Sequence, residues 1–585
     1  MAVDSTNALS ADYRIPIILG ITGHRDLRPQ DIPALKKVLE REFRTVKEDY
    51  PSSPIILLSP LAEGADRLAV RVALKEEINI PVIVPLPMPL TEYEKDFKQQ
   101  SLDEFRALLA QADATFELPF VQGITLDGIR TDRPQRNIQY EQVGAYIARH
   151  CQILIALWDG VRSHKRAGTS TVVSFKLEGI PEPYVIPQGP LDQIENGMVY
   201  HIVTPRESYS TPDKEPYELV SYGPGRTTEQ DVIEREKDIL RKIDAYNADI
   251  TDHLKHIEKK VKEQLDTIAA THNTELMPME IEIQVRSTVA SELAKIYQTE
   301  RQGAIWGLYV LPVIALFAFQ LYLEFSHYIA ARGMLALYPA ILALGLGYQW
   351  WANKKSHYHS KHIDYRAIAE GLNIQFYWLI AEMKEEVPDY YLRKQKGELD
   401  WIRQAIRYST MLIKMKESGN CRRNDKWQER YRHWIQNVWI RGQKDYFKPK
   451  SQHNHNQSEK YEKRARYLYV IGILLTVMMF IFYNFLHENL HENYHHVAVV
   501  AVTMLLFLNS TLIGYSERLA HSELAKQYER MYHVYTVAEE RLKERIDNGN
   551  QQEARKLIRE LGREALAENG DWVLIHRKRP PELYN

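Results

Sequence analysis

The amino-acid sequence predicts an α/β domain with a parallel sheet, followed by an α-helical four-span membrane domain with cytosolic helices. Two observations lead to this prediction. In the first third of the chain, short apolar runs alternate with amphipathic stretches, and later in the chain four uncharged apolar stretches each approach 20 residues. The 585 residues carry a formal net charge of -2 and have a mean hydropathy of -0.41. These averages are typical of soluble proteins, so only a local window reveals the membrane segments.

The short apolar runs predict the strands of the α/β domain. Near-continuous apolar strands separated by helices are typical of a parallel sheet that is covered on both faces. In such a sheet, ligands bind beyond the carboxyl ends of the strands, so the residues that follow each run are candidates for a binding site. The runs are Pro16 to Leu19, Ile55 to Leu58, Val82 to Val84, Ile153 to Leu157 and Val199 to Val203.

Four longer apolar stretches predict membrane-spanning helices, because a hydrocarbon core about 30 Å thick needs roughly 20 apolar helical residues. The stretches are Gly303 to Leu323, Gly333 to Ala352, Tyr467 to Leu486 and Val497 to Tyr515. Aromatic residues, which prefer the membrane interface, stand near their ends: Trp306, Trp350, Trp351, Tyr467, Tyr469 and Tyr515. The alternative is four core helices of a large soluble domain, but such helices rarely stay uncharged over about five turns.

Basic residues predict the orientation of these helices. Arg332 is the one Lys or Arg between the first two stretches, and His487 to His496 contains none. On the opposite side stand Lys354, Lys355, Lys361, Lys460, Lys463, Arg464, Arg466, Arg518 and Lys526. Since positive residues stay on the cytoplasmic side, we expect a multi-pass protein of the cell inner (plasma) membrane with both termini cytoplasmic. No cleaved signal peptide is expected. The two cysteines, Cys151 and Cys421, are consistent with a reducing compartment.

Glycine-containing loops follow three of the predicted strands. Glycines let the backbone approach a ligand, and Arg25 offers a fork of donors to a phosphate. A glycine loop ahead of a helix also presents free N–H groups to an anion, although Asp66 is equally interpreted as a favourable first-turn charge. The loops are Gly20 to Arg25, Ser59 to Asp66, and Trp158 to Gly160 with Gly168 to Ser170; Arg136 and Asn137 begin the helix that leads into the third of these strands.

Together these motifs resemble the SLOG superfamily, the Rossmann-like fold shared by DprA/Smf-like DNA-processing proteins and Lonely-guy-type proteins. The stretch SPLAEGADRLAVRVAL is similar to the DprA-type pattern SGLAxGIDxxAHxxAL, with Pro60, Ala65 and Val70 in place of the family's Gly, Ile and His. The resemblance covers roughly the first 205 residues and implies a pocket for a nucleotide or nucleotide-derived ligand. The residues expected to bind this ligand are Gly20, Thr22, Gly23, Arg25, Ser59, Glu63, Gly64, Asp66, Arg136, Asn137, Trp158, Asp159, Gly168, Thr169 and Ser170.

One departure from the family pattern bears on catalysis. Lonely-guy hydrolases carry PGGxGTxxE, whose glutamate serves the chemistry, and Val172 stands at that position here. Because valine cannot act as an acid or base, the resemblance favours a binding or sensing role over phosphoribohydrolase activity. No catalytic or metal-binding residue is assigned and no cofactor is expected, while Glu63, Asp66 and Asp159 remain possible acids.

The rest of the chain predicts a series of helical parts. A Pro, Ser and Tyr-rich stretch from Pro205 to about Thr227 indicates a domain boundary, and apolar residues at helical spacing from Ile239 to Val261 predict a coiled coil or helical stalk. We therefore expect a nucleotide-binding domain at 1-210, a linker and stalk at 211-302, a first two-span unit with a cytosolic helix at 303-386, a basic and aromatic cytosolic segment at 387-464, and a second two-span unit with cytosolic C-terminal helices at 465-585.

The two-span units look like a repeat, since HIDYRAIAEGLNIQFYWL follows the second span, ELAKQYERMYHVYTVAEERL follows the fourth, and Tyr365 and Tyr528 are roughly equivalent. This arrangement resembles the SLATT-type effectors, transmembrane proteins that the family links to prokaryotic nucleotide-signalled conflict systems. Within the spans, the side chains of Asn509, Ser510 and Thr511 are expected either to form hydrogen bonds with neighbouring helices or to line a pore. The outer-loop histidines His487, His491 and His495 are compatible with a solvated loop or with a zinc or pH-sensing site.

The combined resemblance implies a membrane effector gated by a nucleotide second messenger, which forms pores or disrupts the lipid bilayer in antiviral defence. Four spans are few for a monomeric pore, so a homo-oligomer is expected. A membrane-anchored nucleotide hydrolase or glycosidase is the alternative. A transporter is less favoured because no charged residue lies within a span. No nucleic-acid partner is expected, because the N-terminal domain lacks a dense basic stripe.

Overall fold

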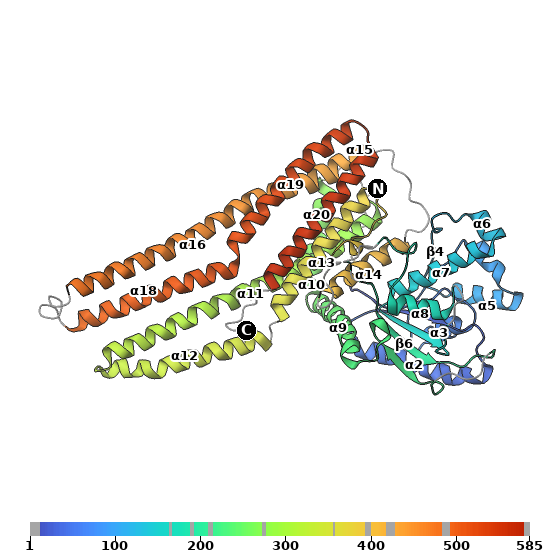
Figure 1. The fold of residues 1–585 in the computed structure, drawn as a ribbon, viewed down its shortest axis with the longest axis horizontal. Helices are drawn as coiled ribbons and strands as arrows, with labels where there is room; N and C mark the ends of the chain where they lie inside the picture. The colour runs from blue at the N-terminus through green and yellow to red at the C-terminus, as the bar shows by residue number, and fades with distance from the viewer. Residues whose placement is uncertain are drawn as a thin grey trace. The chain divides into compact units, whose positions relative to one another are not determined.

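The computed structural model divides into two compact units that interleave along the chain (Figure 1). It describes every residue except 1–11, 163–166, 188–191, 193, 209–213, 272–275, 355–356, 392–398, 417–426, 483–491 and 578–585. The α/β unit comprises residues up to 289 together with 371–375 and 385–424, and the helical unit comprises 290–370, 376–384 and 425–585. The borders of the units therefore fall inside two helices, α11 (Pro278–Phe325) and α13 (His357–Ile380).

A seven-stranded sheet forms the centre of the α/β unit. The strand order is β4-β3-β2-β1-β5-β6-β7, and all neighbouring pairs are parallel except β6 with β7. This confirms the predicted α/β class with its mostly parallel sheet. The strands are β1 (Ile17–Gly23), β2 (Ile55–Leu58), β3 (Val82–Leu86), β4 (Ala114–Glu117), β5 (Ile153–Trp158), β6 (Met198–Val203) and β7 (Leu219–Tyr222).

The sequence did not predict the two edge strands, β4 and β7. β4 has the sequence ATFE, in which Phe116 alone is buried, and β7 has the sequence LVSY with one buried residue, Val220. Strands this short and this exposed lack the continuous apolar run that marks the central strands. β7 lies within the stretch that was interpreted as a domain boundary, so the sheet extends beyond residue 210.

Helices cover both sides of the sheet (Figure 1). Because parallel crossovers are right-handed, the helices that connect β1 to β4 lie on the opposite face from α8, which connects β5 to β6. The helices and turns of this unit are η1 (Pro29–Asp31), α2 (Ile32–Asp49), α3 (Ala65–Ala73), α4 (Leu90–Tyr93), η2 (Glu94–Asp96), α5 (Gln99–Leu109), α6 (Leu126–Thr131), α7 (Arg133–His150), α8 (Thr169–Glu178), η3 (Pro224–Arg226), α9 (Gln230–Asp252) and α10 (Leu254–Thr271).

The predicted stalk is part of the α/β unit. The apolar stripe of α9 is buried, and the Asn247 side chain accepts a hydrogen bond from the backbone N–H of Ile15 and donates to the Ile15 carbonyl, both at 2.8 Å. The same amide donates to Ser53 Oγ at 2.9 Å. These bonds tie α9 to the segment that leads into β1, and α9 also packs against α14, so the stripe is buried within the α/β unit and does not form a free-standing stalk.

A segment from the middle of the chain completes the α/β unit. After α13, the turn η4 (Val387–Asp389) and helix α14 (Asp400–Lys416) pack against α7, α9 and β4. The side chain of Gln375 accepts a hydrogen bond from the N–H of Val387 at 2.8 Å, and Gly371 lies so close to Ile406 that a Cβ there would approach Ile406 Cδ1 to 2.4 Å. The segment expected as one cytosolic part at 387-464 is thus divided between the two units.

Buried ion pairs hold this segment in place. Arg407, which is 5% exposed, contacts Glu195 at 2.7 Å and Asp389 at 3.5 Å, and Arg149 pairs with the same two carboxylates. Burial acts to raise the pKa of Glu195, but the charges of Arg407, Arg403 and Arg149 hold it well below its usual range. Each carboxylate therefore lies between cations from α7 and α14.

The helical unit contains four long helices with apolar segments, and each holds one of the expected spans. They are α11, α12 (Ile329–Lys354), α16 (Gly442–Ile481) and α18 (Glu492–Leu519). α15 (Trp427–Arg430) and a π-helical segment, η5 (Tyr431–Arg441), run into α16, while α19 (His521–Asp547) and α20 (Gln551–Arg577) follow α18. The end of the third expected span at Leu486 and the histidines His487 and His491 lie outside the described residues.

Specific side-chain contacts join the four apolar helices. The hydroxyl of Tyr309 on α11 donates to the Gly514 carbonyl of α18 at 3.0 Å, and the rings of Phe319 on α11 and Tyr338 on α12 lie 4.8 Å apart. On α16, a Cβ at Gly472 would meet Leu506 of α18 at 3.3 Å, so the missing side chain allows close packing there. These contacts link α12 to α11, α11 to α18 and α18 to α16.

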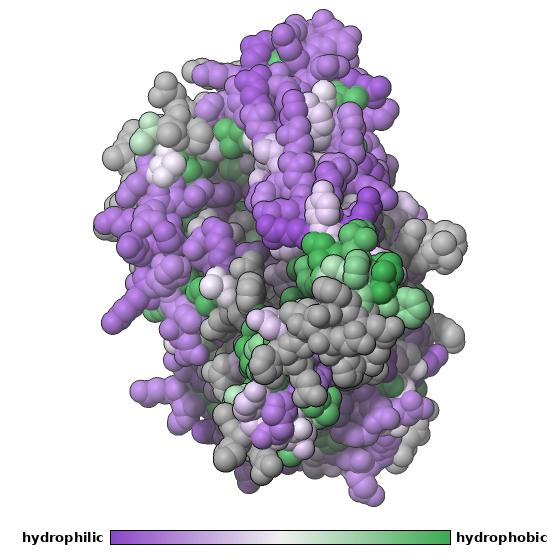
Figure 2. Space-filling view, turned by 90° about the vertical axis from the view of Figure 1, so that its left-hand side faces the viewer, coloured by the Kyte–Doolittle hydropathy of each residue, from purple (hydrophilic) through white to green (hydrophobic). Residues whose placement is uncertain are grey.

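The outer faces of these helices expose large apolar side chains. Two stretches, Trp427–Ile481 and Tyr494–Asp547, are helices long and apolar enough to cross a membrane, with 11% and 6% of their most apolar windows buried. Tyr309–Phe325 and Gly333–Tyr348 are shorter apolar helices. Figure 2, seen from the side toward which α16 and α18 extend, shows one large group of hydrophobic side chains and several smaller ones on a face that is otherwise mostly hydrophilic. The helical C-terminal part with two helices of membrane-crossing length is thus confirmed.

Candidate ligand site at the carboxyl edge of the sheet

The strand order places a candidate site beyond β1 and β5. β2 to β4 lie on one side of β1, and β5 to β7 lie on the other. The connections after β1 and β5 therefore diverge at their carboxyl ends, which is the position where open α/β sheets bind ligands. The loops after β1, β2 and β5, in which the sequence placed most of its candidate residues, all leave this edge of the sheet.

His24 joins the β1 loop to the β5 loop. It is 6% exposed, its backbone N–H donates to the Leu157 carbonyl at 3.1 Å, and its Nε2 accepts a hydrogen bond from the N–H of Asp159 at 2.9 Å. A neutral imidazole whose Nε2 accepts carries its proton on Nδ1. His24 is not among the residues predicted to bind a ligand, although its place directly after a buried strand was the available signal.

Asp159 stands at the first position after β5. Burial acts to raise its pKa, but the neighbouring His24 side chain, the hydrogen bond from the Val161 N–H and the charge of Arg206 hold the pKa of Asp159 below its ordinary value. Its Oδ1 lies 3.4 Å from His24 Nε2 and accepts from the Val161 N–H at 3.0 Å. Asp159 is therefore an ionised side chain that is fixed by its own loop.

A second buried histidine, His201 on β6, lies beside this loop. Its Nε2 lies 2.8 Å from the Trp158 carbonyl, and its ring centroid lies 5.3 Å from that of Trp158. Burial lowers the pKa of His201, and its Nδ1 has no hydrogen-bond partner among the described residues. Trp158, a predicted ligand residue, is itself buried within β5.

The β2–α3 loop packs directly on the β1 loop. Gly64 has a φ of 82°, and a Cβ there would lie 2.4 Å from the His24 carbonyl oxygen. A Cβ at Gly23 would lie 2.3 Å from Ala65 Cβ. The first N–H of α3, from Ala65, donates to the His24 carbonyl at 3.0 Å. Both glycines are thus required for the contact between the loops, and one N–H expected to face an anion is bonded within the protein.

Other predicted residues have structural partners. Ser59 Oγ accepts from the N–H of Leu61 at 3.2 Å, and Glu63 accepts a short hydrogen bond from Ser101. Gly20 lies within β1, not in the loop after it, because the strand extends to Gly23. A Cβ at Gly20 would meet Cys151 Sγ at 2.8 Å, so the glycine lets α7 pack on the strand. Thr22 is likewise buried within β1.

The two predicted arginines differ in their availability. Arg136 pairs with Asp96 at 2.6 Å and donates to the Glu92 carbonyl at 2.8 Å, so it anchors the segment after β3. Arg25 is exposed, its guanidinium lies 6.0 Å from the centroid of the Tyr140 ring, and among the described residues it forms no ion pair within 4 Å. Arg25 is therefore the cation that remains available to a ligand.

Asp66 is the most unusual acid of the site. It is 4% exposed, and burial raises its pKa from 3.8 to about 7, against the charges of Arg25 and Arg67 and a backbone hydrogen bond from Ala62. The neighbouring Arg67, 1% exposed, donates to the Leu61 carbonyl at 3.1 Å and to Glu104 at 2.9 Å. Arg67 is not among the predicted residues, and its burial is unusual for an arginine.

The loop after β5 leads to the start of α8, which belongs to the same α/β unit. Gly168 precedes this helix and accepts from the N–H groups of Thr171 and Val172; Thr169 is half-buried, and Ser170 is buried. Val172 packs on α7, where a Cβ at Gly144 would meet it at 2.7 Å. Asn137, on the first turns of α7, is half-buried. The residue at the hydrolase glutamate position is thus a packing residue.

No protein-family model, curated protein or solved structure matches this chain. Among the described residues, no group of His, Cys, Asp and Glu side chains is arranged to hold a metal ion. The chemistry of the site therefore has to be inferred from its own residues, of which Arg25, Asp66, His24 and Asp159 are the most informative.

The raised pKa of Asp66 predicts a pH dependence of stability. The folded state favours the neutral carboxyl, so this contribution to stability is fully present below pH about 4 and is lost as the pH rises through about 7. Asp66→Asn stays neutral, so its thermal unfolding midpoint should rise relative to wild type between these pH values and then keep a constant offset. Asp252→Asn, at an exposed position of α9, should follow wild type throughout. Parallel profiles for Asp66→Asn and wild type would contradict the buried, neutral carboxyl.

The close approach at Gly64 predicts a large effect of a single methyl group. Gly64→Ala should destabilise the α/β unit by about 3 kcal/mol, because the added Cβ meets two backbone oxygens and the backbone conformation disfavours side chains. Gly123 provides a matched control, since its φ of 88° is similar but its Cβ would meet nothing within 4 Å. Gly123→Ala should therefore cost about 1 kcal/mol. Equal losses in chemical unfolding would show that the loops do not touch.

Proposed function

We propose that the chain is a membrane effector gated by a nucleotide-derived second messenger that binds the carboxyl edge of the sheet. In this proposal the four apolar helices α11, α12, α16 and α18 span the inner membrane with both termini in the cytoplasm. Ligand binding changes the helical unit so that it forms pores or disrupts the bilayer. As the resemblance to SLOG and SLATT proteins implies, the setting is a prokaryotic defence system.

The outward apolar faces of the four helices carry this proposal. Leu344 and Leu346 on α12 are each 67% exposed, and Phe480 on α16 is 83% exposed. Monomeric soluble proteins rarely expose contiguous apolar surface of more than a few hundred square ångströms, whereas a bilayer core is the solvent for which such faces are suited. The helices lie in one unit and are linked by direct contacts, which supports a single four-helix membrane domain.

Four hydroxyl side chains of α16 and α18 form hydrogen bonds within their own helices. Thr476, Thr503 and Thr511 each donate to the carbonyl four residues earlier, at 2.8, 2.9 and 2.8 Å, and Ser510 donates in the same way at 3.3 Å. A hydroxyl bonded to its own helix can face lipid at little cost. This pattern favours hydrogen bonding within the helix over pore lining by Ser510 and Thr511. Four spans are few for a monomeric pore, so a pore in this proposal requires several copies of the chain.

The nucleotide ligand is supported by the place of the site in the fold. The edge of the sheet at β1 and β5 carries an exposed arginine, Arg25, and the start of α8 at Gly168 and Thr169. A guanidinium and helix N–H groups are the donors that phosphate oxygens accept. A ligand can shift the helical unit only if it binds one state more tightly, so the active oligomer should bind the nucleotide more tightly than the resting form.

A membrane-anchored nucleotide hydrolase or glycosidase is the second candidate, and Asp66 favours it. A carboxyl with a pKa near 7 can donate or accept a proton at cellular pH. Val172 and the internal bonding of Asp159 weigh against this function. Separating the nucleotides by chromatography after incubation with the full chain would decide, because turnover that is lost in Asp66→Asn supports the enzyme.

The proposed topology predicts which positions are accessible from outside the cell. In a chain with Cys151→Ala and Cys421→Ala, a cysteine at Ser326, between α11 and α12, should react with a membrane-impermeant maleimide in intact cells. A cysteine at Ser522, on the first turn of α19, should react only after lysis. Both positions lie at exposed sites, so low reactivity cannot be ascribed to burial. Reaction of Ser522→Cys in intact cells, or of neither position before lysis, would contradict the proposed orientation.

Arg25 predicts the strongest effect on ligand binding. Full-length protein in detergent would be screened with cyclic oligonucleotides and ADP-ribose derivatives by thermal shift. Arg25→Ala should weaken binding of the responding nucleotide by about 10- to 100-fold, the loss expected for a charge-assisted hydrogen bond. Arg44→Ala removes an exposed arginine of α2 and should bind like wild type. Equal affinity of both variants would remove Arg25 from the site, and no response to any nucleotide would overturn nucleotide gating.

A further inference from the structure

One face of α16 changes from cationic to apolar along its length. Lys460, Lys463 and Arg464 are followed by Tyr467 and then by exposed apolar residues at spacings of three or four: Ile471, Leu474, Met478 and Ile481. Residues at this spacing lie on the same side of an α-helix. Tyr467 and Leu474 are 67% and 62% exposed, so this face points away from the neighbouring helices over its whole length.

The opposite face of α16 is the packed one. Ala465 is 3% exposed, and Gly472, buried like Ala465, lies against Leu506 of α18. Glu462, the acid nearest to the three cations on this side, accepts a hydrogen bond from Ser458. The cations are therefore not arranged toward a partner helix. They continue the line of side chains that faces lipid in the proposed membrane domain.

The charges of this face are largely uncompensated. Lys463 pairs with Glu459 at 2.6 Å, but both side chains are about half exposed or more, and such a surface pair contributes little. Lys460 and Arg464 are exposed and form no ion pair with any described residue. The face thus carries two free cations and one weakly paired cation within five residues.

The distance of these cations from Tyr467, the first residue of the expected span, indicates which layer of a bilayer they would contact. At 1.5 Å per residue, Arg464 lies about 5 Å and Lys460 about 10 Å from Tyr467 along the helix axis. The headgroup layer outside the hydrocarbon core is roughly 5–8 Å thick, so these side chains reach the depth of the lipid phosphates. Tyr467 stands between the cations and the apolar residues, where aromatic rings prefer the interface.

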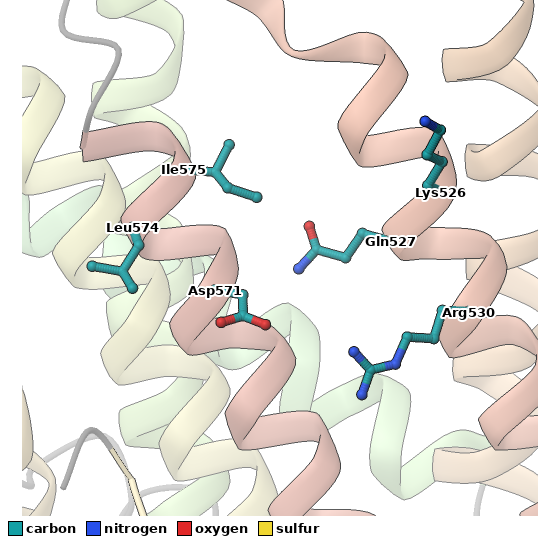
Figure 3. A pocket seen from close by; sticks show the side chains of 6 residues that line it. All are labelled: Lys526, Gln527, Arg530, Asp571, Leu574 and Ile575. Atoms are coloured by element: carbon teal, nitrogen blue, oxygen red, sulfur yellow. The ribbon is translucent and has the colours of Figure 1, made fainter. Parts of the chain in front are cut away.

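A second basic region lies too far away for the same contact. Lys526, Gln527 and Arg530 on α19 line an open pocket of about 480 Å³ with Asp571, Leu574 and Ile575 on α20. Figure 3 shows the side chains of Gln527 and Arg530 pointing toward Asp571. Lys526 is eleven residues beyond Tyr515, compared with three and seven residues between Tyr467 and Arg464 or Lys460, and Ala520 breaks the helix between Tyr515 and Lys526. The pocket also holds a carboxylate, so α16 carries the more suitable surface.

We infer that the face formed by Lys460, Lys463 and Arg464 is a binding surface for anionic phospholipid headgroups of the cytoplasmic leaflet. Juxtamembrane cations attract anionic lipids by about 1 kcal/mol each, and the two neighbouring acids do not cancel them. This inference rests on the proposed membrane domain and adds to it a preference for a chemical class of lipid. The surface would fix the depth and rotation of α16 in the bilayer.

The test measures lipids at the surface of the full chain reconstituted in phosphatidylcholine vesicles. Spin-labelled phosphatidylglycerol and spin-labelled phosphatidylcholine are added separately, and the fraction of each that is motionally restricted by the protein is measured by electron paramagnetic resonance. Wild type should restrict a larger fraction of the anionic lipid. The preference should weaken at high salt, because screening shortens the range of these interactions.

The variant Lys460→Gln/Lys463→Gln/Arg464→Gln should lower the preference for phosphatidylglycerol toward one. Lys255→Gln/Lys259→Gln/Lys262→Gln, on the exposed surface of α10, removes the same charge and should keep the wild-type preference. Equal restriction of the two lipids by wild type, or equal loss in the two variants, would overturn the inference. Restriction of neither lipid would instead contradict the membrane domain itself, so the two failures are distinguishable.

Discussion

The contact of Arg407 with Glu195 and Asp389 fixes a segment from the middle of the chain within the α/β unit. Taking these charges out of water costs several kcal/mol per ion, and only their mutual pairing offsets that cost. With the pairs intact, α14 packs against α7, α9 and β4, and residues 371–375 of α13 join the same unit. Loss of one partner would leave a buried charge at a cost of about 3–5 kcal/mol, so the packing of α14 depends on this cluster.

The sequence predicted the central strands because each is a continuous apolar run, and it predicted the edge of the sheet where the glycine loops meet. It could not show what those loops contact. Gly64 and Gly23 were read as places where a ligand approaches, yet the structure places protein backbone or side chains against both. His24 and Arg67 were missed, because a buried polar side chain is recognised by its partners, which lie far away in sequence.

The helical half divides in the same way. Long uncharged stretches are a local property, so the sequence located the apolar segments of α11, α12, α16 and α18, although α11 and α16 begin well before those segments. The apolar residues of α9 are also recognisable in the sequence by their helical spacing. That spacing does not determine which part of the protein they pack against. Asn247 bonds to Ile15 over 232 residues, and the burial of α14 depends on Glu195 and Asp389, which no periodicity connects to it.

The interleaved order of the units has a consequence for synthesis. A chain leaving the ribosome presents β1 to β7 and α9 first, but the side chains of α14 that complete their packing follow only after α11, α12 and α13 have been made. Until then Glu195 lacks its partner Arg407 and Arg149 lacks its partner Asp389. The surfaces of α7 and β4 that α14 later covers face water during this time. The N-terminal unit therefore reaches its final form only after the first pair of apolar helices has emerged, so a ribosome-bound chain that ends before α14 should leave the surfaces of α7 and β4 uncovered.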